Sequence, residues 1–123
     1  MELKFYISLR AARLLKENGY NEETDHFIDD DGDIFEDKYC MNENLPDWRW
    51  SCPSKAEAID WLDKNGIIIE VTNINKDKWS YIIFIDDHET YSSSDYDIYF
   101  QTRLEAEDMG IIKSLELVKI KNK

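Results

Sequence analysis

The feature that most constrains the fold is a helix with clearly marked ends that leads directly into a strand, in CPSKAEAIDWLDKNGIIIEV. Ser54 and Glu57 form a capping box, in which each side chain satisfies a backbone amide that the first helical turn leaves unpaired. Asn65-Gly66 is typical of a helix C-terminus, because glycine tolerates the left-handed conformation found there. Ile67, Ile69 and Val71 then recur at every second position, which is the period of a β-strand. This stretch therefore predicts mixed α and β structure with short connections.

Two further helices are predicted from caps and apolar spacing. Ser8 and Gly19 delimit an amphipathic helix that should cover about Leu9–Asn18. Near the C-terminus, a capping box of Thr102 and Glu105 should open a helix that continues to about Val118. Gly110 lies inside this last helix, where glycine costs about 1 kcal/mol relative to alanine, so we expect close packing against another element there.

The remaining segments predict strands, turns and one loop. Trp79–Ile85 is a strongly apolar strand that should pair with Ile67–Val71 as a hairpin. Asp31-Gly32 lies between apolar pairs, which predicts a first hairpin, since glycine permits the positive φ of the turn. Leu3–Phe5, ahead of the first helix, and Ile98–Phe100 are expected to be short strands. The polar run DDHETYSSSDYD, between the second hairpin and Ile98, is expected to be a surface loop. Residues 1–123 should thus form a single α+β domain, with an antiparallel sheet built from two hairpins and packed with three helices.

Charge restricts the classes of partner. The chain has a net charge of −12, and residues 21–47 contain eleven acidic residues against one basic residue, Lys38. A molecule of this charge repels nucleic acid and anionic membranes, so we expect no direct binding to either. A basic protein partner or a cation is electrostatically favoured.

Cysteine usage and the absence of apolar runs predict a cytoplasmic protein. No run reaches the length needed to cross a bilayer, and the N-terminus lacks the layout of a signal peptide. Cys40 and Cys52 should therefore be free thiols. With His26 and His88 they show no zinc-ligand spacing, and no cofactor-binding motif is present, so we expect no cofactor.

The acidic stretch FIDDDGDIFED raises the question of a calcium loop. An EF-hand needs oxygen ligands at its first, third and fifth positions and a glutamate at the twelfth. With Gly32 at the sixth position, Asp29 and Asp31 fit, but Phe27 and Lys38 occupy the first and last positions. A hairpin turn is the favoured interpretation, and a divalent-cation site of low affinity at Asp29, Asp31 and Asp33 is the alternative.

Catalytic chemistry has little support in the sequence. His88 lies in DDHE, where consecutive side chains of an extended segment alternate in direction and do not converge. Cys52 precedes a helix N-terminus, which can lower a thiol pKa, but a small buried residue is the simpler interpretation. We therefore expect no enzyme and no catalytic residues, and keep a small enzyme of unknown type as the last alternative.

An interaction surface is the better hypothesis. Trp48 and Trp50 would share one face of an extended segment with Arg49 opposite, and tryptophan and arginine are enriched at binding hot spots. For the two tryptophans themselves, however, the favoured interpretation is that both pin an irregular loop to the core. The candidate surface consists of Asp29, Asp30, Asp31, Asp33, Glu36, Asp37, Trp48, Trp50, Asp86 and Asp87.

The caps and helical motifs together also resemble a family of small uncharacterised proteins from gut-bacterial genomes and prophages. The matching positions are Gly19-Tyr20, Pro53-Ser54, the AIDWL segment at residues 58–62, Glu105-Ala106 and Gly110-Ile111. The resemblance spans almost the whole chain and implies a shared fold without an activity. Together with the acidic residues of 21–47, it favours a non-enzymatic, phage-related accessory protein that binds a protein partner through its acidic face, with mimicry of nucleic acid as one specific form. Such a protein could be a monomer or a homodimer.

Overall fold

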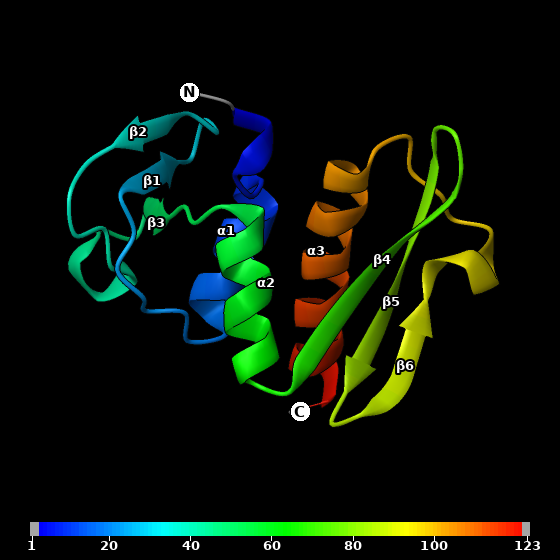
Figure 1. Cartoon of the computed structure of the whole chain (residues 1–123). Helices are drawn as coiled ribbons and strands as arrows, with labels where there is room; N and C mark the ends of the chain where they lie inside the picture. Colours follow the sequence, from blue (N-terminus) through cyan, green and yellow to red (C-terminus); the bar gives the residue numbers. More distant parts are fainter. Residues whose placement is uncertain (1–2, 122–123) are drawn as a thin grey trace.

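The computed structural model describes residues 3–121 and confirms an α+β fold. The structure has three helices and two antiparallel sheets of three strands each, and Figure 1 shows that the helices lie between the sheets. The helices are α1 (Leu9–Glu17), α2 (Lys55–Lys64) and α3 (Arg103–Lys121), with short 3-10 turns at Leu3–Phe5, Asn42–Asn44 and Ser93–Tyr96. The strands are β1 (His26–Asp29), β2 (Ile34–Glu36), β3 (Arg49–Ser51), β4 (Ile67–Asn75), β5 (Lys78–Ile85) and β6 (His88–Ser92).

Both predicted hairpins are present, and each is extended by a third strand into its own sheet. The first sheet has the order β2-β1-β3, and the second has the order β4-β5-β6. The third strands come from segments without a clear strand pattern, because β3 has only three residues and β6 is polar. The two hairpins therefore do not join into one sheet, and the helices fill the space between them (Figure 1).

Three local predictions differ from the structure. Leu3–Phe5 forms a 3-10 turn instead of a strand, since only Tyr6 pairs with a neighbour, in a single bridge to Ser54. Ile98–Phe100 contributes one bridge, from Phe100 to Trp79, and no strand. The expected loop after β5 contains β6, because a two-residue turn reverses the chain and lets this polar segment pair with β5.

The predicted residues cap the helices, although the Glu105 carboxylate bonds to the Thr102 hydroxyl and not to its amide. The Ser8 hydroxyl accepts the amide of Ala11, and the Ser54–Glu57 capping box makes both of its hydrogen bonds. At the start of α3 the Glu105 amide donates to the Thr102 hydroxyl at 3.1 Å, and that hydroxyl donates in turn to the Glu105 carboxylate. These bonds fix the first turns of all three helices.

One buried core joins the helices to both sheets. It contains Leu15 of α1, Leu62 of α2 and Ile111 of α3, together with Ile28 of the first sheet and Ile83 of the second. Gly110 lies where α3 crosses β4 and β5, and a Cβ built there would be 2.9 Å from Ile69 Cγ2. The close packing expected at this glycine is therefore confirmed. Within residues 3–121, none of the helices has both the length and the apolar character needed to span a bilayer.

Candidate functional site

The acidic turn between β1 and β2 is closed by a hydrogen bond from the Asp29 amide to the Asp33 carbonyl, which leaves Asp30-Asp31-Gly32 as a three-residue hairpin loop. Its Asp29 carbonyl accepts the Gly32 amide at 3.0 Å, and Gly32 has a φ of 83°. The Asp29 carboxylate accepts the amides of Asp31 and Asp33, each at 3.0 Å. This carboxylate thus has a structural task, which is to hold the turn closed. The predicted hairpin is confirmed.

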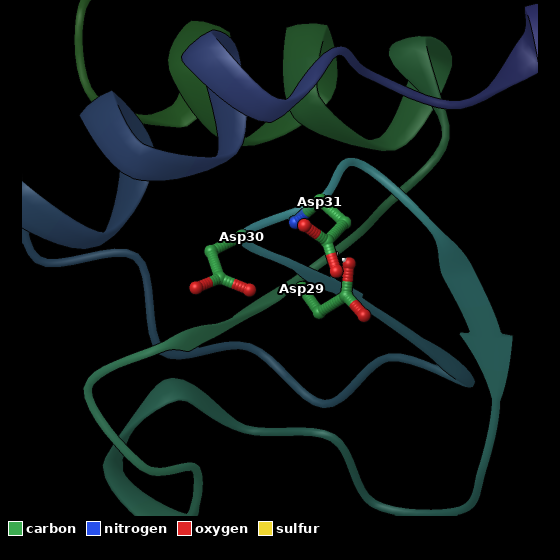
Figure 2. Close-up of side chains that lie close together, drawn as sticks. All are labelled: Asp29, Asp30 and Asp31. Atoms are coloured by element: carbon green, nitrogen blue, oxygen red, sulfur yellow. Dashed lines mark hydrogen bonds between the residues drawn. The ribbon is translucent and has the colours of Figure 1, made fainter.

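The cation hypothesis concerns the same turn. Figure 2 shows Asp29, Asp30 and Asp31 at its tip, and one oxygen from each lies within 4.8 Å of the others. Asp33, which the sequence proposed as a ligand, is not part of this group, and Asp30 takes its place. The Asp29 carboxylate, which a cation would need as a ligand, already accepts two backbone amides through its Oδ1. The arrangement is therefore a weak ligand set for calcium, which usually takes six to eight oxygens.

The outward face of the first sheet carries a continuous stack of rings around one guanidinium group. Phe27 and Phe35 face each other across β1 and β2 with ring centroids 5.2 Å apart. The guanidinium carbon of Arg49 lies 4.6 Å from the Phe27 centroid and 4.3 Å from that of Trp48. Trp48 is 50% exposed and Phe35 is 44% exposed. We call these four residues the aromatic–arginine stack.

This arrangement corrects the predicted geometry of the Trp-Arg-Trp segment. Arg49 was expected opposite both tryptophans, but it lies against Trp48, because Trp48 precedes β3 and is free to turn towards it. Trp50 pairs with Ile28 in the sheet and packs against the core, with the guanidinium carbon of Arg13 4.9 Å from its ring centroid. Only one of the two tryptophans therefore faces outward, and the core-pinning alternative holds for Trp50.

Arg49 has an unusual environment for an arginine. Its Nε is buried and has no hydrogen-bond partner, and among residues 3–121 no carboxylate lies within 4.0 Å of its guanidinium group. Its charge is met by the faces of Phe27 and Trp48, which is a cation–π arrangement. The group is thus held rigidly by packing, and its ionic capacity is not used within the described chain.

The acidic residues of the predicted surface do not form one face. Asp30, Asp31, Asp33, Glu36 and Asp37 are exposed on or beside the first hairpin. Asp86 and Asp87 form the turn between β5 and β6, at the opposite end of the molecule in Figure 1. Both have positive φ, 51° and 68°, which is the conformation of a tight hairpin turn. The acidic surface beside the aromatic–arginine stack therefore consists of the first hairpin alone.

The candidate catalytic residues have surroundings unlike those of reactive groups. Cys52 is fully buried, and its burial raises the pKa of the thiol to about 12, against the lowering expected from a helix N-terminus. Burial also raises the pKa of Cys40. His26 Nε2 lies 4.0 Å from Glu36, with no hydroxyl or thiol hydrogen-bonded to it in the described part of the chain. His88 is exposed at the start of β6.

Two of the stack residues, Phe27 and Phe35, were missed from the sequence as site candidates. Their signal was present, because the register of a three-residue hairpin loop places them opposite each other on one face. The proximity of these two rings to Trp48 could not be predicted from the sequence, because it depends on the pairing of β3 with β1.

Comparison with known proteins identifies no relative: no family model, curated protein or solved structure matches this chain.

Proposed function

We propose that this protein is a non-enzymatic accessory protein that binds a partner protein through the outer face of its first sheet. The observation that carries the proposal is the aromatic–arginine stack, whose exposed ends are Phe35 and Trp48. Exposed aromatic rings fixed around an arginine have the composition of binding hot spots. In a free monomer, the half-exposed rings of Phe35 and Trp48 contribute little to the stability of the fold.

The acidic hairpin beside the stack defines the chemistry of the partner. Exposed carboxylates at Asp30, Asp31 and Asp33 border the stack, and the turn contains no basic residue. Such a border attracts a basic surface and accelerates its association at low salt. The partner should therefore present an apolar pocket or ridge within a basic surface. The buried free thiols of Cys40 and Cys52 fit a reducing compartment, and we propose the cytoplasm.

Mimicry of nucleic acid is a narrower form of the same proposal, and it has less support. A mimic needs carboxylates spaced along an extended surface, as phosphates are along a duplex. Here three carboxylates crowd within 4.8 Å at one turn, and the second acidic turn lies at the other end of the molecule. The phage relationship rests on the sequence resemblance alone.

The test compares capture by matched variants. The wild-type protein is immobilised, proteins retained from a bacterial lysate are identified, and the strongest is purified and its affinity measured. We expect Trp48→Ala with Phe35→Ala to weaken binding at least about tenfold. Tyr96→Ala, which removes an exposed ring from the 3-10 turn after β6, should leave the affinity unchanged.

A second pair of variants separates charge from stacking. Asp30→Asn with Asp31→Asn should slow association and flatten the salt dependence, whereas Asp86→Asn with Asp87→Asn should do neither. Equal binding by wild type and the double-alanine variant would exclude the aromatic–arginine stack as the site. Displacement of the partner by DNA would favour the mimicry form.

A further inference from the structure

A large concave feature is lined by none of the residues of the aromatic–arginine stack. It is a groove of about 1000 Å³ between the first sheet and the N-terminal part of α3. Its walls are largely apolar, with Ile28 and Ile34 on one side and Leu104 and Met109 on the other. Sites for small ligands commonly have volumes of about 300–1000 Å³ and walls of this kind with a few polar groups.

The groove contains a buried cation without an ionic partner. Lys55 is only 8% exposed, and it lines the groove at the first residue of α2. Its Nζ donates one hydrogen bond to the backbone carbonyl of Lys4. Within residues 3–121, no carboxylate lies within 4.0 Å of this ammonium group, and no second acceptor bonds to it. A lysine is almost never buried without a charged partner, because removing its charge from water is costly.

The surroundings add positive potential to the same place. In Figure 1 the three helices run side by side with their N-terminal ends at the same end of the molecule, and Ser8, Lys55 and Thr102 from these ends line the groove. The aligned peptide dipoles place a partial positive charge at each end. Lys4, Arg103, Glu105 and Asp108 also line the groove, and Arg103 forms an ion pair with Glu107, so the helix ends and Lys55 are the source of this positive potential.

The two carboxylates in the groove have local tasks. Asp108 Oδ1 accepts the Ser8 amide at 2.9 Å, which ties α3 to the start of α1. Glu105 accepts the Thr102 hydroxyl at 3.2 Å as part of the α3 cap. Neither forms an ion pair with Lys55.

We propose that this groove binds a small amphiphilic carboxylate, with its apolar chain along Ile28, Ile34, Leu104 and Met109 and its carboxylate on the Lys55 ammonium. The carboxylate would complete the hydrogen bonding of Lys55, and charge-assisted hydrogen bonds of this kind are among the strongest in proteins. A dispersed ligand fits better than an anionic membrane surface, which the net charge of the protein would repel. The proposal does not depend on the partner protein, because the two surfaces contain different residues.

The test uses decanoate and the uncharged 1-decanol, both below their aggregation limits. Binding is followed by amide chemical shifts in NMR spectra of the labelled protein. Decanoate should bind at least about tenfold more tightly than decanol, which corresponds to about 1.4 kcal/mol. The perturbed amides should map to the groove. Equal affinities, no binding, or perturbations elsewhere would overturn the proposal without any variant.

Variants then test whether Lys55 binds the carboxylate of the ligand and whether the ligand lies in the groove. Lys55→Met keeps the aliphatic stem and should bring decanoate down to the affinity of decanol. Lys64→Met, on the same helix but exposed and paired with Asp60, is the matched control and should keep the preference. Met109→Trp should fill the groove and weaken both ligands. Retention of the decanoate preference in Lys55→Met would contradict the assignment of the carboxylate to this lysine.

Discussion

The substitution Gly110→Ala sets two opposite physical effects against each other, and the structure decides between them. In an exposed helix interior, alanine stabilises relative to glycine by about 1 kcal/mol. At this position, however, the added Cβ would lie 2.9 Å from Ile69 Cγ2 and 3.4 Å from Tyr81 Cγ. Ile69 is buried, and its Cγ2 is attached directly to its own Cβ, so it has little freedom to withdraw.

The expected magnitude follows from these two terms. Overpacking a well-filled core costs about 1–3 kcal/mol, which exceeds the gain in helix propensity. We therefore expect Gly110→Ala to lower the free energy of unfolding by about 1 kcal/mol. With a urea m-value of about 1.5 kcal/mol/M, the midpoint of denaturation should fall by about 0.7 M. Far-UV circular dichroism and tryptophan fluorescence should report the same shift.

A double-mutant cycle isolates the contact. Ile69→Ala removes Cγ2 and should cost about 2–5 kcal/mol through loss of buried surface and the cavity it leaves. In that background Gly110→Ala no longer meets the methyl group and should stabilise by about 1 kcal/mol, so its sign reverses. The reasoning is refuted if Gly110→Ala stabilises the wild-type protein, or if its effect is the same in both backgrounds.

Three further predictions concern the caps, the thiols and the acidic turn. Ser54→Ala should lower the free energy of unfolding by about 1 kcal/mol in urea denaturation, because it removes the capping box of α2; an unchanged midpoint would contradict this. Burial raises the pKa of Cys52 to about 12, so the unfolded chain releases this proton at lower pH than the folded chain does. Stability should therefore be retained below about pH 8.5 and fall as pH rises towards 12, by at most about 1.4 kcal/mol per pH unit for this group, and Cys52→Ala should flatten that slope in melts recorded from pH 8 to 11. About 1 mM calcium should leave the melting temperature within error of a magnesium control, because Asp29 already accepts two amides; a rise that disappears in Asp30→Asn would restore the cation site.

Short-range patterns determined the elements with clear signals. The Ser54–Glu57 capping box marks the start of α2, and the alternation from Ile67 places β4 directly after it. The Asp-Gly pair predicts the first hairpin, because only a few turn types return the chain within three residues. These features depend on neighbours a few positions apart, so they are readable along the chain.

Long-range pairing decided the rest. β6 forms from a polar segment, since β5 presents an unpaired edge to it, and the same logic adds β3 to the first sheet. The close approach of Arg49 to Phe27 follows from that second pairing, and so does the inward position of Trp50. No local pattern encodes such pairings, because their energy comes from residues that are distant in sequence.

The candidate sites divide in the same way. The sequence by itself determined the acidity of the first hairpin and the presence of aromatic residues in and near it. Only the tertiary structure separated the two acidic turns and brought Lys55 into a groove between segments up to about one hundred residues apart. Composition determines which charged residues a chain carries. The packing of segments distant in sequence decides which of these residues are buried, and a buried charge is a stronger candidate for a specific binding site than an exposed one.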